Sequence, residues 1–541
     1  MTAAWQPDDA VSLPVVLDRR AEMSGDRVAV TINGVDISYA DMATRSIRYA
    51  NGLLRLGVGR GEPVSMLMAN STDHVLGWLG ASRLGAVDIP INTAYTGDFL
   101  RRTLQNANSR VLLCDDEYLD TVRDTARDGG VEIVVLRGGD SSGLARLRAA
   151  GLDAVPWEHL EEGEASRLNL PGEISYRDMS SVIYTSGTTG ASKGVTFSHN
   201  YLLSAARQML GLYQSTEDDT YFGSMPMFHL AAKACGVVGS LLTGQHTVLD
   251  PKFSVSRTWQ RVRETEATVV HLLGSMIVML YNQPETPEDA ELPMRAIFAA
   301  PVPGTIQQQF EERFDCKIVT CYALSEACQI TKGGLDVPYP PNSAGRVNDE
   351  LFEVRLVEDG DVDVPLDTTG EIVVRPKKSQ VMFSGYWRNP AATQEAMDNL
   401  WFHTGDLGRI DEDGWFYYEG RKKDALRRRG ENVSAAELED VLRQHPAVND
   451  AAAVGVPSEV MEDDIFAVVE LVEDATVDYA ELQEFCAQKL PFFMVPRYYE
   501  IVASLPRNPI AKVEKYRIKS QGLTTSTWDA TAKDFVEAKP V

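Results

Sequence analysis

The sequence predicts an α/β protein with a large N-terminal domain of layered α/β subdomains plus a small barrel-like β region, followed by a small α+β C-terminal domain. Apolar strand-like runs alternate with amphipathic helical stretches from about residue 30 to residue 250, a pattern typical of layered α/β architecture. Strand-like runs then dominate residues 353–418 and predict the β region. A compact βα pattern follows a short basic segment that begins at Arg421.

Individual elements follow from hydrophobic patterning. The predicted strands are Val28–Val30, Pro63–Leu67, Val111–Cys114, Val131–Leu136 and Thr247–Leu249, and the predicted helices include Ala40–Leu56 and Tyr201–Tyr213. Turn residues at 358–360 and 411–414 separate the later strands. We therefore predict an N-terminal core over residues 1–420, a C-terminal domain over 421–520, and a disordered tail over 521–541, which is rich in Thr and Ala.

Charge and composition exclude several classes of protein. The chain of 541 residues has 52 Lys and Arg against 78 Asp and Glu, a formal net charge of −26, which would repel nucleic acid and anionic membranes. Neither a signal sequence nor a membrane-spanning stretch is apparent, so a cytoplasmic protein is expected. The six cysteines are dispersed without metal-ligand spacing, which argues against disulfides and structural zinc.

The segment Tyr184–Gly194 has the composition of a phosphate-binding loop. Its glycines let backbone N–H groups approach an anion, its hydroxyls can donate to phosphoryl oxygens, and Lys193 adds a positive charge. A flexible linker has a similar composition, but an apolar strand precedes this segment. The residues around Lys193 do not fit the NTPase P-loop, so the segment predicts a nucleotide polyphosphate site of another family.

Further motifs, in the same order and spacing, resemble those of the acyl-adenylate-forming (AMP-binding) superfamily. They are Pro226-Met227-Phe228-His229, Tyr322-Ala323-Leu324-Ser325-Glu326, Thr404-Gly405-Asp406, Gly420-Arg421-Lys422-Lys423-Asp424, and Pro506–Lys512. The segment Arg428-Arg429-Gly430-Glu431-Asn432-Val433-Ser434 most resembles free-standing acyl-CoA ligases of the carnitine/crotonobetaine-CoA ligase branch. The resemblance spans nearly the whole chain.

The resemblance implies an ATP site with bound Mg²⁺. Thr185 and Glu326 would serve in catalysis and hold the metal, because hydroxyl and carboxylate oxygens suit Mg²⁺. Asp406 and Arg421 would bind the ribose, while Ala300, Pro301, Cys321 and Tyr322 would contact adenine. The remaining nucleotide-binding residues would be Ser186, Gly187, Thr188, Thr189, Gly190, Lys193 and Ser325.

The resemblance also assigns roles to the C-terminal domain, which would be mobile. Lys512 would reach the carboxylate and the α-phosphate during adenylation, and rotation about the hinge Lys423 would then present another face to CoA. Arg428, Arg429 and Gly430 would bind CoA on that face. A cluster of arginines is also common on solvated surfaces, which is the alternative interpretation.

The acyl pocket is assigned to His229, Lys233 and Gly274, with His229 near the carboxylate or simply filling a helix N-terminus. Lys233 interrupts an apolar stretch, and two interpretations are open. An ammonium in the pocket would favour a short or polar acid, even a dicarboxylic one. Alternatively, Lys233 points to solvent or pairs with an acidic neighbour.

The leading hypothesis is an AMP-forming ligase that joins a carboxylic acid to CoA through an acyl-AMP intermediate. A second hypothesis keeps adenylation but replaces CoA with another acceptor, or the acid with an oxyanion such as nitrite. A third is a catalytically silent protein that only binds nucleotide, although the presence together of Lys193, Glu326, Asp406 and Lys512 argues against it. The resemblance also suggests a homodimer.

Overall fold

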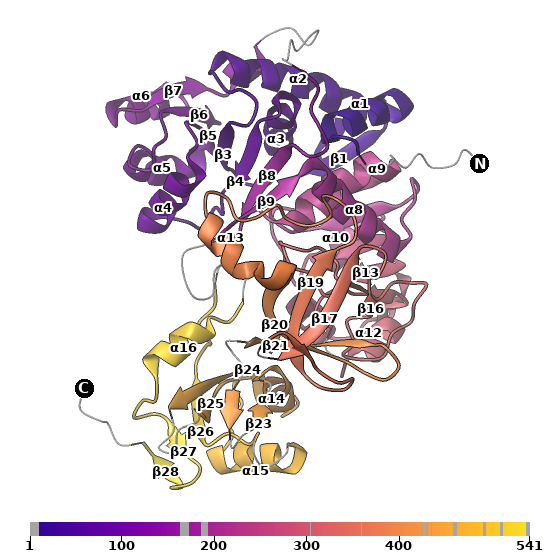
Figure 1. The fold of residues 1–541 in the computed structure, drawn as a ribbon, viewed down its shortest axis with the longest axis vertical. Coiled ribbons are helices and arrows are strands. Elements are labelled where there is room, and N and C mark those ends of the chain that lie inside the picture. Colours follow the sequence, from indigo (N-terminus) through magenta and orange to yellow (C-terminus); the bar gives the residue numbers. More distant parts are fainter. Residues whose placement is uncertain are drawn as a thin grey trace.

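The computed structural model describes residues 10–162, 172–185, 193–302, 304–358, 360–422, 426–428, 431–433, 435–457, 463–490, 494–508 and 512–536. Figure 1 shows the two α/β layers at one end, an antiparallel sheet beside them, and a separate small C-terminal domain at the other end. The predicted fold class is confirmed. Among the described residues, no helix combines the length and the hydrophobicity that crossing a membrane requires.

The first α/β layer is a seven-stranded sheet that ends in the strand after the predicted phosphate loop. All neighbouring strands are parallel except the last pair. The strand order is β7 (Asp153–Pro156), β6 (Ile133–Arg137), β5 (Val111–Asp115), β3 (Pro63–Leu67), β4 (Val87–Pro90), β8 (Met179–Tyr184) and β9 (Gly194–Ser198).

The second layer is also seven-stranded and parallel, apart from its terminal hairpin of β1 and β2. Its order is β14 (Lys317–Val319), β13 (Ala296–Phe298), β12 (Val269–His271), β10 (Thr220–Gly223), β11 (His246–Leu249), β1 (Val28–Ile32) and β2 (Val35–Ser38). The five strands predicted from hydrophobic runs are therefore confirmed in the two layers, within a few residues at their ends.

Helices cover both sheets, and serine side chains begin the two that the sequence predicts. Ser38 Oγ accepts from Asp41 N at the start of α2, and Ser198 Oγ accepts from Tyr201 N at the start of α8. The N-terminal helices are α1 (Leu13–Ser24), α2 (Tyr39–Arg55), α3 (Thr72–Leu84), α4 (Gly97–Ala107), α5 (Leu119–Thr125), α6 (Ser141–Ala149), α7 (Glu158–Glu161), α8 (His199–Tyr213), the π-helix η2 (Ala232–Val238), α9 (Gly239–Thr243), α10 (Thr258–Glu264), α11 (Gly274–Tyr281) and α12 (Gln307–Phe314).

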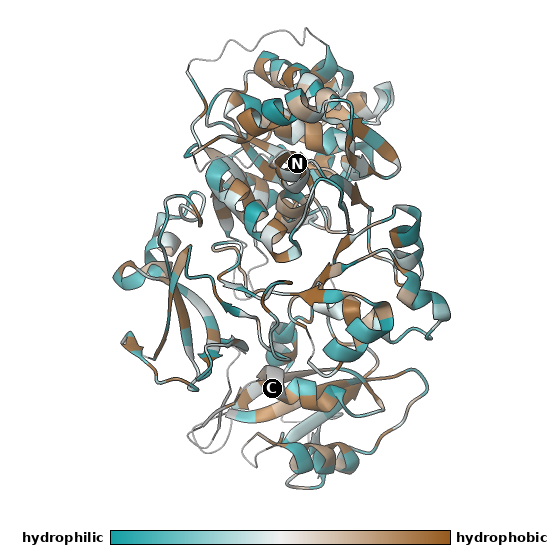
Figure 2. Ribbon diagram, turned by 90° about the vertical axis from the view of Figure 1, so that its right-hand side faces the viewer, coloured by the Kyte–Doolittle hydropathy of each residue, from teal (hydrophilic) through white to brown (hydrophobic). Residues whose placement is uncertain are grey.

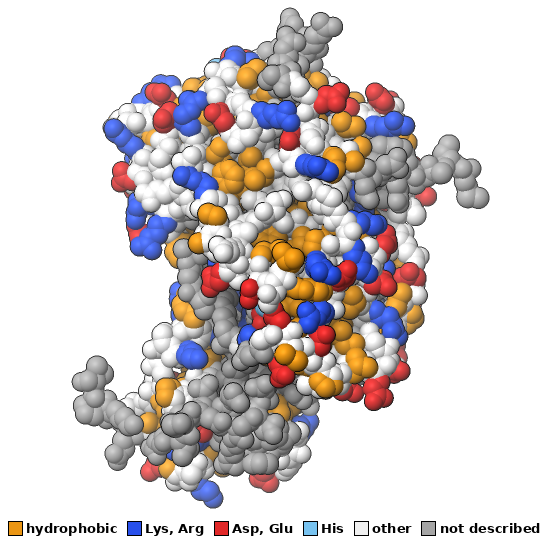
Figure 3. All heavy atoms as spheres, in the orientation of Figure 1, with side chains coloured by type: hydrophobic (Ala, Val, Ile, Leu, Met, Phe, Trp, Pro, Cys, Tyr) orange, Lys and Arg blue, Asp and Glu red, His pale blue; other side chains and the backbone are white. Residues whose placement is uncertain are grey.

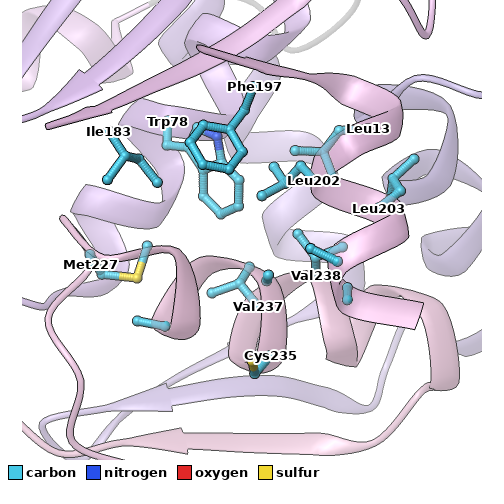
Figure 4. Packing of buried hydrophobic residues seen from close by; sticks show 14 of the residues in the cluster. Leu13, Trp78, Ile183, Phe197, Leu202, Leu203, Met227, Cys235, Val237 and Val238 are labelled. Carbon is cyan, nitrogen blue, oxygen red and sulfur yellow. The ribbon is translucent and has the colours of Figure 1, made fainter. Parts of the chain in front are cut away.

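The main core lies where the two layers meet. Figure 4 shows side chains from α1, α3, β8, β9, α8 and η2 converging there, and the labelled residues are buried. Figure 2 shows many hydrophilic residues on peripheral helices, whereas interior strands are largely hydrophobic. Burial of this shared apolar surface fixes the two layers against each other.

The predicted β region is a five-stranded antiparallel sheet with one helix, α13 (Pro390–Ala396). Its order is β18 (Val362–Asp363), β17 (Phe352–Glu358), β19 (Gly370–Pro376), β20 (Phe402–Ile410) and β21 (Phe416–Arg421), and the short hairpin β15 (Thr331–Lys332) and β16 (Arg346–Val347) lies nearby. The turn at Gly414 joins β20 to β21, and its N–H donates to Asp411 O at 3.0 Å. This turn has only the structural role expected of an Asp-Gly pair.

The C-terminal domain is a second, smaller sheet with helices. Its strands are β24 (Val448–Pro457), β25 (Asp463–Leu471), β26 (Tyr498–Val502), β27 (Trp528–Asp529) and β28 (Asp534–Phe535), with the hairpin β22 (Leu426–Arg428) and β23 (Glu431–Val433) and the helices α14 (Ala435–Arg443), α15 (Tyr479–Lys489) and α16 (Lys515–Gln521). The prediction of a disordered tail is wrong for residues 521–536. The buried Trp528 stacks on Tyr479 at 5.8 Å, and β27 pairs with β26, so one aromatic anchors this Thr- and Ala-rich segment.

Candidate active site

Three parallel strands of the second layer, β12, β13 and β14, end side by side, and the predicted adenine-contacting residues follow the last two. Ala300 and Pro301 follow β13, and Cys321 and Tyr322 follow β14. Backbone hydrogen bonds hold these strand ends together: Leu272 N donates to Phe298 O at 2.9 Å, and Ala299 N donates to Val319 O at 3.0 Å. Ligands of open α/β sheets bind at such carboxyl ends.

Gly274, at the start of α11, lies against the same strand ends. A Cβ atom at this position would collide with the carbonyl oxygen of Pro301. Glycine is therefore required for the close approach of α11 to the segment after β13. The structure thus brings Gly274 together with Ala300 and Pro301, as the predicted site requires.

Asp406 forms the centre of a buried polar cluster beside these strand ends. It is 1% exposed, accepts from Tyr322 Oη at 2.7 Å through Oδ2, and lies 2.7 Å from Arg421 Nε through Oδ1. The antiparallel register of β20 and β21 places Asp406 opposite Arg421. Burial raises the pKa of Asp406, and the positive charge of Arg421 opposes that rise.

Aromatic side chains form the floor of this cluster. Tyr322 stacks on Phe416 at 5.4 Å and on Tyr418 at 5.7 Å, with 23° between the ring planes in both pairs. Phe416 and Tyr418 alternate along β21 and so share one face of the sheet. The sequence analysis missed both residues, although the period-2 alternation of the strand could have predicted their common face.

Lys512, on the C-terminal domain, acts on this cluster. Its positive charge contributes to lowering the pKa of Asp406, although burial remains the largest influence. Two hydrogen bonds with Asn508 hold the backbone of Lys512 in place: Lys512 N donates to the side-chain Oδ1 of Asn508 at 2.9 Å, and Asn508 N donates to Lys512 O at 2.9 Å. The charge of one predicted site residue therefore acts on another from a different domain.

Glu326 and Thr185 lie at the second part of the site, around the base of the predicted phosphate loop. Glu326 Oε1 accepts from Tyr386 Oη at 2.8 Å. Thr185 N donates to Lys193 O at 3.0 Å, and the ammonium of Lys193 lies 4.8 Å from the centre of the Tyr386 ring. The carboxylate of Glu326 and the hydroxyl of Thr185 are oxygen donors of the kind that Mg²⁺ prefers, so the residues present fit this metal.

Ser325 contributes its backbone here, because its carbonyl accepts from Tyr201 Oη at 2.8 Å. The sequence analysis missed Tyr386, which lies in the connection between β19 and α13 and is not marked by a local pattern. Several predicted residues lie outside the described part of the chain: Ser186, Gly187, Thr188, Thr189, Gly190, Lys423, Arg429 and Gly430. For Arg428 the structure describes the backbone, which belongs to β22.

His229 follows β10 as the sequence places it, and it carries no charge at neutral pH. Burial lowers its pKa to about 4. Its Nε2 atom is buried, and none of the described residues forms a hydrogen bond with it. Its ring lies 4.8 Å from that of Phe228. A neutral imidazole with a free nitrogen can bind a substrate oxygen without adding charge to the pocket.

Lys233 occupies a different environment from the one that a substrate pocket requires. Its ammonium forms an ion pair with Asp88 of β4, and both side chains are 0% exposed. Asp88 Oδ2 also accepts from Ser181 Oγ at 2.5 Å, and the ammonium lies 4.5 Å from the centre of the Trp78 ring. The hypothesis that Lys233 meets a substrate carboxylate is therefore wrong, because Asp88 already neutralises it; pairing with an acidic neighbour is confirmed.

The cysteine side chains are buried thiols, and Cys321 enters the predicted site only through its place after β14. All six are buried, and burial raises the pKa of Cys328 to about 12 and that of Cys486 to about 11. Their thiols stay protonated at neutral pH, which agrees with the dispersed spacing in the sequence.

The fold and this site define a two-part α/β enzyme whose site lies at the carboxyl ends of parallel strands. Residues 17–387 match the family model described as AMP-binding enzyme, and residues 437–512 match the AMP-binding enzyme C-terminal domain. The chain belongs to the AMP-binding enzyme family. The resemblance predicted from its motifs is thereby confirmed.

Known proteins are similar to this chain over nearly its whole length. A crotonobetaine/carnitine–CoA ligase of Salmonella typhi is 29% identical, and the alignment covers 93% of this chain and 98% of the relative. Crystal structures of MatB from Rhodopseudomonas palustris are 25% identical and cover 94% of this chain and 99% of MatB. The TM-score is 0.83 for the ATP-bound form and 0.72 for the apo form. The anthranilate CoA ligase AuaEII, with 21% identity, 95% and 98% coverage and a TM-score of 0.83, shares the fold.

Proposed function

We propose that the protein is an AMP-forming acid–thiol ligase that uses ATP and Mg²⁺ to activate a carboxylic acid and then transfers the acyl group to CoA. The observation that carries this proposal is the buried cluster of Asp406, Tyr322 and Arg421, on which the positive charge of Lys512 from the C-terminal domain also acts. A cation supplied from a second domain is what the union of two anionic substrates requires.

In the first step, a carboxylate oxygen attacks the α-phosphorus of ATP, and the bond to pyrophosphate breaks. Asp406 and Arg421 would hold the ribose, and the strand ends at Ala300 and Tyr322 would hold the adenine. Lys512 would reduce repulsion between the carboxylate and the phosphate. Glu326 and Thr185 would hold Mg²⁺, which supplies charge neutralisation at the phosphates.

His229 would act as a neutral neighbour of the acid substrate. Because burial lowers its pKa to about 4, it stays uncharged and cannot form an ion pair that would withdraw the carboxylate from its reaction partner. In the second step, the thiol sulfur of CoA attacks the acyl carbon, and AMP leaves with the electrons of the broken bond. Arg428, Arg429 and Gly430 would bind CoA after rotation about Lys423.

The relatives support CoA as the acceptor, since both the Salmonella protein and AuaEII are named as CoA ligases. The greater similarity to ATP-bound than to apo MatB supports a domain arrangement suited to adenylation. Alternatives remain a non-CoA acceptor, an oxyanion such as nitrite, and a silent nucleotide-binding protein. A homodimer is a separate prediction, which light scattering would test.

The decisive experiment is acid-dependent ATP–pyrophosphate exchange over a library of carboxylic acids and nitrite, followed by product analysis with and without CoA. We expect exchange with at least one carboxylic acid, acyl-CoA formation when CoA is present, and loss of exchange in Lys512→Ala. Lys519→Ala, on the exposed side of α16, is the matched control and should retain exchange.

Each alternative predicts a different result. Exchange without any CoA thioester would indicate another acceptor, and exchange with nitrite alone would indicate an oxyanion substrate. Binding of Mg·ATP without exchange for any acid would favour the silent protein and contradict the proposed function.

A further inference from the structure

Tyr386 lies between two site residues of opposite charge and contacts both. Its hydroxyl donates to Glu326 Oε1 at 2.8 Å, and the ammonium of Lys193 lies 4.8 Å from the centre of its ring. The hydroxyl and the ring face are chemically different surfaces: the first stabilises a carboxylate, and the second attracts a cation. One side chain therefore stabilises both groups without bringing them together.

The backbone holds Tyr386 firmly at this place. Trp387 N donates to Gly194 O at 2.7 Å, and Thr196 Oγ1 donates to Gly385 O at 2.7 Å, so the segment 385–387 lies along β9. A Cβ atom on Gly194 would lie 2.7 Å from Val182 Cγ1 and 3.2 Å from Trp387 Cβ. Glycine at position 194 is what permits this close approach at the base of the phosphate loop.

The same segment also reaches Glu326 through the backbone. Phe383 N donates to Glu326 O at 2.8 Å, and the Phe383 ring packs edge-on against that of Tyr386 at 5.2 Å. Tyr386 is 9% exposed. Burial and the negative charge of Glu326 raise its pKa, so the hydroxyl stays protonated and remains a donor at neutral pH.

A direct ion pair between Lys193 and Glu326 would be harmful in such a site. It would occupy the carboxylate needed for Mg²⁺ and the ammonium needed for phosphate, and both would have to be released before Mg·ATP could bind. In the described part of the chain, these two residues form no ion pair with each other; Tyr386 contacts each instead.

We propose that Tyr386 is a positioning residue that keeps Glu326 and Lys193 apart and oriented for Mg·ATP. The inference rests on the proposed use of ATP and Mg²⁺. On binding, Glu326 would turn its carboxylate to the metal and Lys193 would move to phosphate, while Tyr386 keeps the loop base and the segment 383–387 in register. Tyr386 itself transfers no proton and contacts neither reacting atom.

The test measures ATP binding by calorimetry, without acid or CoA, at a series of Mg²⁺ concentrations. Tyr386→Phe keeps the ring and removes the hydroxyl, so we expect the Mg²⁺ concentration for half-maximal binding to rise about threefold to tenfold. Tyr386→Leu also removes the ring face and should raise it by at least about tenfold, because Lys193 and Glu326 can then pair.

Two further variants separate positioning from a general structural effect. Tyr417→Phe removes a hydroxyl that donates to Asp411 Oδ2 at 3.1 Å elsewhere in the β region, and it should leave Mg²⁺-dependent ATP binding unchanged. The double variant Tyr386→Phe/Glu326→Gln should bind no more weakly than Glu326→Gln alone, because Tyr386 acts through Glu326.

Unchanged Mg²⁺ dependence in Tyr386→Phe, or full additivity in the double variant, would overturn the inference. Thermal melting of each variant without nucleotide checks that it is folded. ATP binding is measured without turnover, so the test of Tyr386 does not depend on the reaction. A wild type that binds Mg·ATP but shows no exchange would contradict the proposed function, and the role of Tyr386 could still be tested. A wild type that fails to bind Mg·ATP would overturn both.

Discussion

Two carboxylate–cation pairs in the N-terminal domain differ in how much of their side chains is exposed to solvent. Lys233 and Asp88 are both 0% exposed and lie inside the core between the two α/β layers. In the pair of Asp406 and Arg421, the carboxylate side chain is 2% exposed but the arginine is 31% exposed. The first pair is closed on all sides, whereas the second retains an open edge.

The exposed side chain of Arg421 is what makes the second pair suited to binding a ligand. Arg421 keeps 31% of its side chain exposed, so water reaches this pair from the side of the arginine, whereas the Asp406 carboxylate itself is 2% exposed. The closed pair cannot exchange partners without opening the core. Charge inside an enzyme therefore indicates a ligand site only when part of it stays accessible.

The surface gives a third setting for charge. On the face shown in Figure 3, Lys and Arg side chains are interspersed with Asp and Glu over the N-terminal part. Ion pairs between solvated side chains on such a surface contribute little to stability.

The largest expected effect comes from breaking the closed pair. Lys233→Met leaves Asp88 charged and buried without its partner, so the free energy of unfolding should fall by about 3 to 5 kcal/mol. Urea denaturation measures this change. Lys317→Met is the matched control, because Lys317 pairs with Glu311 at 2.9 Å with 68% of its side chain exposed, and the expected loss is about 1 kcal/mol or less.

The same variant also tests whether the pair is closed to substrate. If Lys233 contacts no substrate, Lys233→Met should keep the wild-type order of preference over a panel of mono- and dicarboxylic acids. A reordered preference would contradict the closed arrangement. Replacing both partners, in Lys233→Met/Asp88→Leu, should recover much of the lost stability.

A smaller effect, on ATP binding rather than on folding, is expected from removing the charge of Asp406 in the second pair. Asp406→Asn should weaken ATP binding by roughly tenfold to a hundredfold, the range of a lost hydrogen bond to a charged group. The free energy of unfolding should change by less than about 1 kcal/mol, because Arg421 can reach water. Asp367→Asn removes a partner of Arg409 on the same sheet and should leave ATP binding intact. A large fall in the free energy of unfolding of Asp406→Asn would contradict the difference drawn between the two pairs, because only the Lys233–Asp88 pair should behave in that way.

The smallest effect concerns pH and the surroundings of the closed pair. Burial and the nearby charge of Lys233 lower the pKa of His74 from 6.5 to about 3. Below pH 6.5 the unfolded chain binds a proton that the folded protein does not, so stability falls as pH decreases. Between pH 7 and pH 5.5 this histidine should lower the free energy of unfolding by about 1.3 kcal/mol.

Thermal melting at both pH values measures that dependence in wild type and in His74→Gln. The variant should show a smaller decrease, whereas His159→Gln, at a partly exposed position, should behave like wild type. An identical decrease in His74→Gln and wild type would show that the closed region does not resist protonation.

Much of the fold was predictable because local patterning and burial agree. Strands such as Pro63–Leu67 are apolar at every position but Ser65, because parallel strands are covered on both faces. Ser198 begins α8 by accepting a hydrogen bond, a preference visible in the sequence. The segment beyond residue 521 could not be predicted, because Trp528 is buried by packing on residues such as Tyr479 and Tyr499, which lie in other parts of the sequence.

The candidate site was predictable to the extent that its chemistry resides in short motifs. Asp406, Tyr322 and Glu326 were identified from their own sequence neighbourhoods, and the structure brings Asp406 and Tyr322 into contact. Tyr386 was not identified, because its role depends on Glu326, 60 residues away, and on Lys193, which lies much earlier in the chain. The state of Lys233 depends likewise on Asp88, 145 residues earlier.

The sequence by itself determined the layered α/β class, the order of the motifs and the residue types available for binding a nucleotide, since these follow from local periodicity and side-chain chemistry. Only the tertiary structure decided which charged side chains are fully buried in an ion pair and which stay partly exposed to solvent. Desolvation and pairing depend on what packs around a charged group, and in a parallel α/β fold those neighbours come from distant parts of the chain.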